Sequence, residues 1–412
     1  MIMGMFGELL TPIKLYLFPT LETVLSFWFV WLPVILIFGF YHIWITYKRQ
    51  EFHFNQGFIL LEIKIPKDIM KSPFAMETVL GHFYQTGGEG TFIDRSIVGK
   101  TRPWFALEMV SLGGQVHFYV WSRKNFKNLI EAQIYAQYPT VEIHEVEDYA
   151  LPFTSNPDVN SIWGCEFDLT KVDAYPIKTY LDYGLDRDPD EEFKIDPLAS
   201  LVEFLGSIGA GEQIWIQIIV RAHKKEIHKP GTWFGTVDWT DAAKKEIENL
   251  RKQSFTGPDG QEVKTSVLTE GTKDAIAAIE RSIGKPAFDC GIRGIYIADK
   301  DRFNPINITG LTGAFKAFSS QALNGFKPAR GLTIFSYPWQ DYADIRKNKV
   351  KADLIDAYKK RSYFFPPAQS PSFILTTEEL ATLFHFPGQA VGTPSFTRIP
   401  SRKAEAPSNL PI

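Results

Sequence analysis

An uninterrupted apolar run near the N-terminus constrains this chain more than any other feature, because residues 23–47 contain no Asp, Glu, Lys or Arg. A bilayer core about 30 Å thick is crossed by roughly 20 apolar residues at 1.5 Å rise each, and residues 25–45 supply that length. Glu22 and the Lys48-Arg49 pair bracket the run. We therefore predict a transmembrane helix over 23–47, preceded by a segment over 1–22 that lies along the membrane interface.

A cleaved signal peptide and a buried core helix are the alternatives for this run. A signal peptide has a basic start, a short apolar stretch and a cleavage site of small residues, whereas this run ends in the bulky, charged sequence Tyr47-Lys48-Arg49-Gln50. Lys48 and Arg49, with further lysines up to Lys71, outweigh Lys14 on the other side. The positive-inside rule then predicts a single-pass protein of the inner or plasma membrane, with its folded part in the cytoplasm.

Composition places the remainder of the chain among folded proteins. The 412 residues are 45% hydrophobic and 22% charged, close to globular averages. A formal net charge of −3 gives no general attraction to nucleic acid, although a local basic patch is compatible with it. Cys165 and Cys290 are the only cysteines, which fits a reducing compartment and excludes a disulfide framework or a cysteine-rich zinc site.

The first folded stretch, 58–150, predicts the order β-α-β-β-α-β. Pro66 ends a strand over 58–65, and Ser72-Pro73 begins a helix, because Ser caps helices well and Pro suits the first helical position. Strands follow over 104–111 and 115–121, joined by the hairpin signal Gly113-Gly114. A helix over 125–138 and a strand over 141–146 complete a ferredoxin-like unit.

A second unit of the same kind is predicted over 160–340, which makes the fold class α+β. Its predicted strands and helices, in chain order, are a strand at 162–169, a helix at 197–205, strands at 213–222 and 293–298, a helix at 308–319 and a strand at 332–336. A helical insertion occupies 224–283, with helices over 240–253 and 273–282. A helical segment over 341–388 follows, and Thr376 or Thr377 caps its helix over 378–384. We predict an extended Pro-rich tail over 389–412.

No catalytic, cofactor or metal residues are predicted. Residues 97–101 resemble the end of a phosphate-binding loop, but Asp94 stands where that loop needs Gly and a strand follows instead of a helix. A nucleotide hydrolase with a non-standard site at Lys100 is one alternative function. A second is binding of nucleic acid or acidic lipid by the basic stretch 221–229, through Arg221, Lys224, Lys225 and Lys229.

Three segments carry a family resemblance. They are RPWFALEMVSLGGQVHFYVWSRKNFKNLIEAQIYAQYPTVEIHEVEDY, GAGEQIWIQIIVRAHK and FILTTEELATLFHFPG, which a Pro-rich tail follows. In this order they resemble the non-catalytic N-terminal region, a domain of unknown function, of membrane-associated HerA/FtsK-type ATPases of conjugative type IV secretion systems. In such ATPases a P-loop motor follows the Pro-rich segment, whereas this chain stops at Ile412. The resemblance therefore implies a P-loop ATPase partner that is encoded separately.

The leading hypothesis is a membrane-anchored, non-enzymatic scaffold that docks such an ATPase. Its contact surfaces are then the insertion and the last helix, with residues Glu378, Glu379, Leu380, Leu383 and Phe384. Deleting 375–412 is expected to abolish ATPase binding while the remainder stays folded. The sequence leaves the partner's identity, the transported substrate, nucleic-acid binding and the oligomeric state, including a homo-oligomer, open.

Overall fold

The computed structural model describes residues 25–66, 71–186, 196–225, 227–228, 236–253, 269–332, 337, 339, 341–366 and 368–388. The interfacial segment predicted over 1–22 and the tail predicted over 389–412 lie outside these residues. Contacts divide the chain into two compact units. The anchor unit contains Met1–Asn55 and Gly88–Thr101, and the sheet unit contains Gln56–Gly87 and Arg102–Ile412.

The anchor unit is built on one long apolar helix, α3 (Trp28–Gln56). The predicted N-terminal apolar helix is thus confirmed, but it does not end at Tyr47. It continues through Lys48 and Arg49 for a total of 29 residues, with Pro33 inside it. The segment Gly88–Thr101, which we call the anchor loop, adds a short π-helix, η2 (Asp94–Val98).

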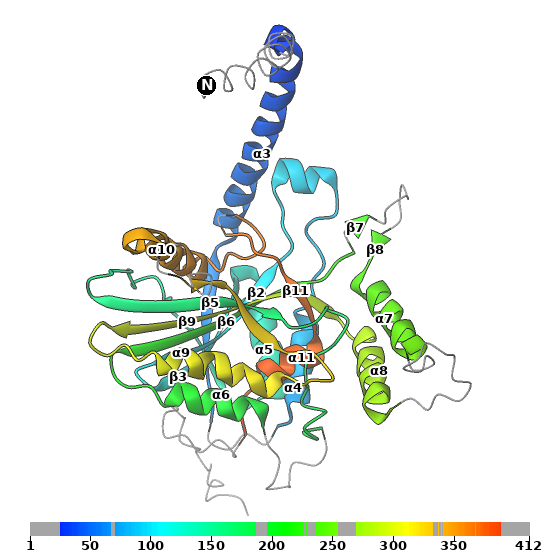
Figure 1. The fold of residues 1–412 in the computed structure, drawn as a ribbon, viewed down its shortest axis with the longest axis vertical. Coiled ribbons are helices and arrows are strands. Elements are labelled where there is room, and N and C mark those ends of the chain that lie inside the picture. Colours follow the sequence, from blue (N-terminus) through cyan, green and yellow to red (C-terminus); the bar gives the residue numbers. More distant parts are fainter. Residues whose placement is uncertain are drawn as a thin grey trace, which may run out of the picture. The chain divides into compact units, whose positions relative to one another are not determined.

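The sheet unit is a mixed α+β structure around one antiparallel sheet, as the predicted fold class requires (Figure 1). Its strands are β1 (Phe58–Lys64), β2 (Trp104–Leu112), β3 (Gln115–Arg123), β4 (Glu142–Val146), β5 (Asn160–Leu169), β6 (Glu212–Ala222), β9 (Ala287–Asp299), β10 (Phe326–Gly331) and β11 (Phe373–Thr376). They lie in the order β10-β5-β9-β6-β2-β3-β1-β4, with β11 beside β9. The long strand β9 therefore pairs with β5 over its second half and with β11 over its first.

The two predicted halves form one continuous sheet, because β2 pairs with β6 from Trp104↔Arg221 to Leu112↔Gln213. The strand predicted over 332–336 lies, apart from residue 332, outside the described residues. Strand β10 (Phe326–Gly331), just before it, was not predicted. Pro328 argues against a strand because it lacks an N–H donor. It is tolerated here because β10 is the edge strand.

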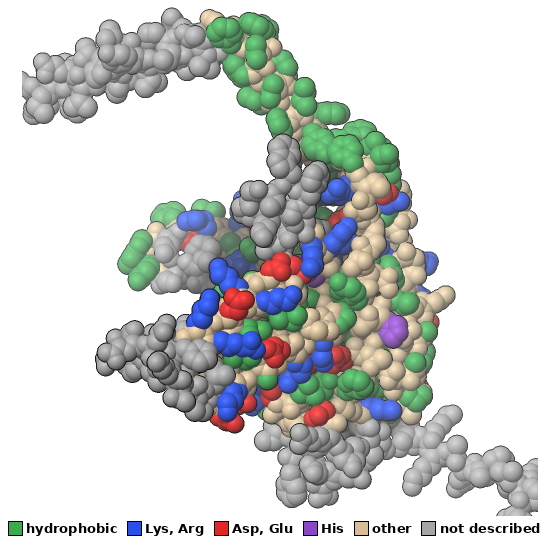
Figure 2. Space-filling model, turned by 90° about the vertical axis from the view of Figure 1, so that its right-hand side faces the viewer, with side chains coloured by type: hydrophobic (Ala, Val, Ile, Leu, Met, Phe, Trp, Pro, Cys, Tyr) green, Lys and Arg blue, Asp and Glu red, His purple; other side chains and the backbone are tan. Residues whose placement is uncertain are grey.

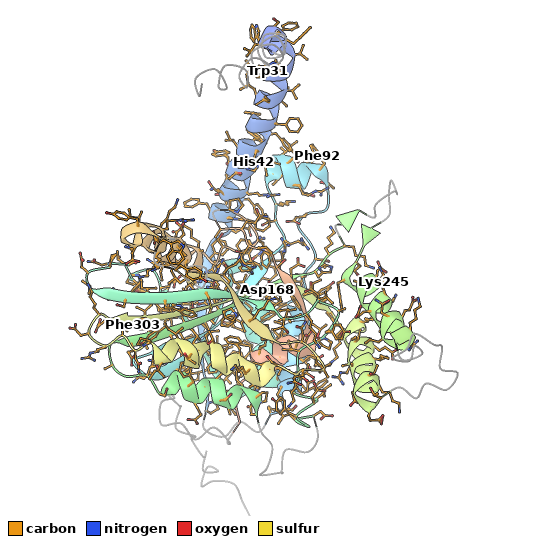
Figure 3. The ribbon with its side chains drawn as sticks, in the orientation of Figure 1. Trp31, His42, Phe92, Asp168, Lys245 and Phe303 are labelled. Carbon is orange, nitrogen blue, oxygen red and sulfur yellow. The ribbon has the colours of Figure 1, made fainter. Side chains whose placement is uncertain are left out.

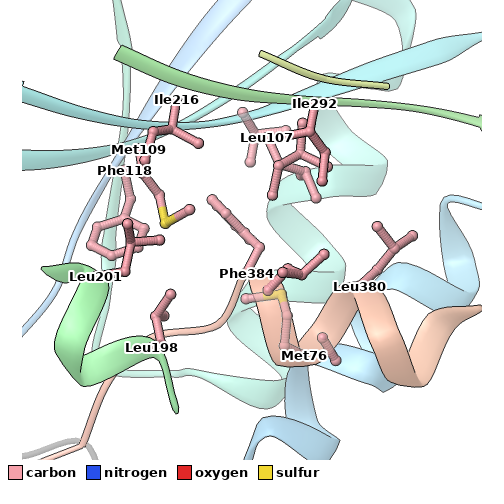
Figure 4. Packing of buried hydrophobic residues seen from close by; sticks show 14 of the residues in the cluster. Met76, Leu107, Met109, Phe118, Leu198, Leu201, Ile216, Ile292, Leu380 and Phe384 are labelled. Carbon is pink, nitrogen blue, oxygen red and sulfur yellow. The ribbon is translucent and has the colours of Figure 1, made fainter. Parts of the chain in front are cut away.

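Helices cover both faces of the sheet. One face packs on α4 (Pro73–His82), α5 (Lys127–Gln137), α6 (Pro197–Gly206), α9 (Ile306–Ala314) and α11 (Thr377–Leu383), and the other packs on α10 (Ile345–Lys359). Strand β2 shows the alternation that this requires: Leu107 belongs to the first core and Ala106 to the second. Figure 4 shows Leu107, Phe118 and Leu380 within the larger core.

Helix starts follow the predicted capping residues. Ser72 caps α4 through a bond from the Phe74 N–H, with Pro73 at the first position. Thr376 and Glu379 form a capping box at the start of α11. The Thr376 side chain accepts a bond from the Glu379 N–H, and the Glu379 carboxylate accepts one from the Thr376 N–H. The short 3₁₀ turns η3 (Lys124–Phe126), η4 (Phe315–Phe318) and η7 (Tyr342–Asp344) connect neighbouring elements.

The predicted insertion is present between β6 and β9, and we call it the arm. It contains the two-stranded β7 (Ile227–His228) and β8 (Thr236–Val237), followed by α7 (Trp239–Gln253) and α8 (Glu270–Ile283). The helices agree with the predictions to within three residues at each end.

Candidate functional site

Helix α3 leaves its apolar side chains exposed. None of its residues is buried, and Phe38 and Ile43 are among the most exposed large side chains of the chain. Figure 2 shows hydrophobic side chains covering this helix. Its most apolar 18-residue window has a mean hydropathy of 1.9, and length and composition of this kind are shared by membrane spans and N-terminal signal sequences. A water-exposed apolar surface of this extent is unfavourable, so the helix requires an apolar environment.

The anchor loop sits on α3 within the same unit. Tyr41 Oη lies 3.0 Å from Ser96 Oγ, and Trp44 Nε1 donates a 2.9 Å hydrogen bond to the Ser96 carbonyl. Gly99 has φ +74° and approaches the Lys48 backbone so closely that a Cβ would lie 2.4 Å from the Lys48 carbonyl carbon. Only glycine fits that position. These contacts hold η2 against the helix (Figure 3).

The arm is attached to the sheet unit by a small apolar cluster. Its helices turn Ala243, Ile247, Ile276 and Ile279 inward against Ala174. Polar contacts surround this cluster. Tyr175 Oη donates to Glu246 Oε1 at 2.8 Å, and Arg281 lies 3.1 Å from a carboxylate oxygen of Glu378.

The base of the arm is held by a histidine between two carboxylates. His223 Nδ1 lies 2.6 Å from Asp289 Oδ1, and His223 Nε2 lies 2.9 Å from Asp238 Oδ1. Asp238 immediately precedes α7 and accepts a bond from the Trp239 N–H. Burial lowers the pKa of His223, but its bonds to Asp289 and Asp238 outweigh this effect, so the pKa is raised above its usual value. An imidazolium in this position joins the sheet to the arm.

The predicted basic stretch does not form an open cationic surface among the residues that the structure describes. Arg221 pairs with Asp289 at 2.8 Å and lies over the Phe364 ring. Lys225 pairs with Asp238 at 3.3 Å, Lys224 is half-buried, and Lys229 lies outside the described residues. We therefore do not retain Arg221 and Lys225 as nucleic-acid or lipid contacts, because their charges are already balanced by aspartates.

The predicted docking helix α11 is buried. Glu378, Glu379, Leu380, Leu383 and Phe384 are 0–4% exposed, so these side chains are not available to a partner. Glu378 accepts a bond from Thr179, and Glu379 accepts bonds from the Thr376 and Ile177 N–H groups. Burial raises the pKa of Glu379 to about 7, and bonds from Thr376 and Ile177 oppose this rise. These residues secure the fold, and we withdraw them as a docking surface.

Sequence reasoning missed a row of buried polar residues under α10. Glu108, Gln217, Arg293 and Glu166 are register neighbours on β2, β6, β9 and β5, and we call them the polar row. Gln217 Nε2 donates to Glu108 Oε1 at 2.8 Å, and Arg293 Nε donates to Glu166 Oε1 at 2.9 Å. Each of these polar residues has a nonpolar residue on both sides within its strand, and that pattern is the signal that the sequence offered.

Arg361, just after α10, closes this network. Its Nε and a terminal nitrogen donate to the two Glu108 carboxylate oxygens at 3.0 and 3.1 Å, and it also pairs with Asp148. Arg361 and Glu108 are fully buried. The network is a structural ion-pair layer, because every charge in it is matched and nothing marks one group for chemistry.

The residues that the structure describes contain no cluster of His, Cys, Asp or Glu suited to a metal ion. The two cysteines are buried and free. Lys100 pairs with Asp94 at 2.9 Å. Asp94, the residue that departs from the phosphate-loop pattern, is thus also the ion-pair partner of the lysine in that pattern.

A family described as "Domain of unknown function (DUF8128)" matches residues 85–398. The chain belongs to this family. The DUF8128 match covers the anchor loop and most of the sheet unit, from β2 to α11, and includes the arm and the polar row. Helix α3 precedes it.

No curated protein matches this DUF8128 chain. Among solved structures, xylooligosaccharide oxidase from Myceliophthora thermophila C1, in complex with xylobiose, is similar at 10% identity and a TM-score of 0.25. The match covers 82% of this chain and 55% of that one, so the chain spans about half of the oxidase. A likeness at this TM-score carries no argument about fold or activity.

Replacing His223 with glutamine is expected to loosen the arm in a pH-dependent way. A folded-state pKa above the unfolded value of about 6.5 means that the stabilisation is fully present below that value and is lost as pH rises through the folded-state pKa. Asp238 and Asp289 have lowered pKa values and stay ionised throughout this range. Hydrogen exchange at the start of α7 should show about 1.5 to 3 kcal/mol less protection in the variant near pH 6.

Near pH 9 the wild type and the His223→Gln variant should converge. His144, which is exposed and lies 3.2 Å from Glu142, provides the control, because His144→Gln should leave α7 unchanged at both pH values. Equal protection in wild type and His223→Gln near pH 6 would contradict the assigned role.

Proposed function

We propose that this chain is a membrane-anchored, non-enzymatic docking protein. The observation that carries this proposal is α3, a 29-residue apolar helix without a buried residue. Its exposed apolar surface is matched by the bilayer interior, and the Lys48-Arg49 pair beyond the apolar run suits the headgroup region. The same pair supports a cytoplasmic position for the sheet unit.

The arm is the surface that we assign to docking. Its helices use their apolar side chains to pack on the sheet unit and turn charged residues of both signs outward. These include the exposed residues Lys244, Lys245, Glu248 and Lys273. In Figure 2 positive and negative side chains are interspersed over the described surface. Interspersed charge of this kind favours specific pairing over general attraction to a polyanion.

We further propose that the sheet unit is a duplicated ferredoxin-like fold. The order β4-β1-β3-β2 in the first half matches β10-β5-β9-β6 in the second, with the arm inserted into the second half. This order and the resemblance to type IV secretion ATPases support a role beside a separately encoded P-loop ATPase. Such a chain would hold the ATPase at the membrane during secretion or DNA transfer.

Membrane fractionation tests the anchor. The full chain with different tags at its two ends should float with membranes and retain both tags. Leu36→Arg combined with Ile37→Arg should raise the fraction of protein found outside the membranes by more than about 10-fold. The reason is that each arginine near a span centre costs about 2.5 to 3.5 kcal/mol. Leu36→Val with Ile37→Val is the matched control. Loss of the N-terminal tag alone would identify a signal sequence and overturn the anchor.

The same membranes test docking. Vesicles carrying the full chain should retain a purified P-loop ATPase encoded beside it, and Lys244→Glu with Lys245→Glu should abolish retention. Lys327→Glu changes an exposed lysine on β10 and should not affect it. Retention that is equal in all three chains would reject the arm as the docking surface.

A further inference from the structure

The anchor loop combines satisfied polar groups with unpartnered apolar side chains. Asp94 pairs with Lys100 at 2.9 Å and accepts a 2.8 Å bond from the Thr91 hydroxyl, so the charge of Asp94 is balanced within the loop. By contrast, Phe92, Ile93, Ile97 and Val98 are 63%, 59%, 53% and 41% exposed. Four large apolar side chains within seven residues form an exposed patch that needs an apolar partner.

The contacts with α3 fix where that patch lies along the helix. Ser96 is bonded to Tyr41 and Trp44, which precede Lys48 by seven and four residues. At 1.5 Å per residue, these positions are about 10 Å and about 6 Å farther along the apolar run than Lys48. The middle of the loop, at Ser96, is therefore held beside the apolar part of α3, while the end of the loop, at Gly99, approaches the Lys48 backbone. Figure 3 shows Phe92 on the turn next to the helix.

We infer that the anchor loop inserts into the membrane leaflet next to α3, as a second and shallower membrane contact. This inference rests on the proposed membrane anchor. Its occupant is the lipid at the boundary between headgroups and acyl chains, because the patch continues the apolar surface of α3. Arg95 is exposed in the same turn and limits the depth, since its long stem lets the guanidinium reach phosphates while the neighbouring isoleucines lie deeper.

Insertion at this boundary also suits the backbone. A segment that crossed the bilayer would have to satisfy all its peptide groups internally, which a turn of this length does not do. At the interface water and headgroups satisfy the remaining groups. Gly99 then has a defined role, because its close approach to the Lys48 backbone keeps the returning chain against the helix.

Fluorescence quenching in vesicles tests the inference. Three variants of the full chain, Ile97→Cys, Ile37→Cys and Phe54→Cys, are each labelled with an environment-sensitive fluorophore at the new cysteine. The native Cys165 and Cys290 are buried, so the label reacts with the introduced residue. The protein is reconstituted into vesicles of phosphatidylcholine and phosphatidylglycerol that carry a nitroxide on the acyl chain. The labels at positions 97 and 37 should emit at shorter wavelength and lose intensity. The label at position 54, on α3 beyond Lys48 and Arg49, should lose much less.

The outcomes separate the two proposals. Quenching at position 37 but not at position 97 leaves the anchor intact and overturns the loop insertion. No quenching at position 37 overturns the anchor, and the loop insertion with it. A shift to shorter wavelength at position 97 without quenching by lipid nitroxide would show that another protein surface, such as a second copy, covers the patch, and it too would overturn the inference.

Discussion

Replacing Arg361 with methionine is expected to lower the free energy of unfolding by about 3 to 5 kcal/mol, the usual cost of removing one partner from a buried ion pair. Methionine keeps much of the side-chain volume, so the loss is electrostatic. Glu108 is fully buried and would be left with only the Gln217 amide and the Tyr149 hydroxyl as donors. Denaturant unfolding of the full chain in detergent measures the change.

Two further variants decide whether the lost free energy of unfolding comes from leaving the Glu108 carboxylate without its partner. Adding Glu108→Gln to Arg361→Met should recover more than about 1 kcal/mol, because the double variant no longer buries an unpaired carboxylate. Arg251→Met is the matched control, since Arg251 and Glu280 form a pair that is about half exposed on both sides. It should cost less than about 1 kcal/mol. A similar small loss in Arg361→Met would refute the structural role of the pair.

The polar row illustrates what sequence patterns do not contain. Glu108 and Arg293 lie 185 residues apart, and Gln217 links them only because β2, β6 and β9 adopt one particular register. A single polar residue in an apolar strand predicts a buried polar group but not its partner. Arg361 is harder still to predict, because it reaches the row from the end of a helix that covers the opposite face from α11.

Residues that begin or end helices and strands explain what the sequence did predict. Pro66, Ser72-Pro73 and Gly113-Gly114 mark strand and helix boundaries chemically, and the elements of the first half follow them closely. Strand β10 was missed because a proline in a strand is acceptable only at an edge, and edges are not visible in a sequence. The contact between the anchor loop and α3 was not predicted, because the two segments lie some 50 residues apart in the chain.

The last helix shows the same limit at a site that matters for function. The capping box at Thr376 predicted the start of α11 correctly, because capping depends on residues three apart. Whether the helix faces solvent depends on what covers it. Here α4 and α6 pack against it, so the five residues that suggested a docking surface lie inside the core.

Replacing Leu380 with alanine is therefore expected to destabilise the sheet unit by about 3 kcal/mol, in the range for truncating a buried leucine. Leu380 is fully buried, in the same core cluster as Met76 and Phe384 (Figure 4). Leu151→Ala removes the same atoms from a side chain that is 63% exposed and should cost less than about 0.5 kcal/mol. Removal of 375–412 deletes part of β11 and all of α11, so it should unfold the sheet unit and not merely release a partner. A stable, folded deletion variant, together with a small effect of Leu380→Ala, would contradict the burial of α11. The helix would then again be a candidate docking surface.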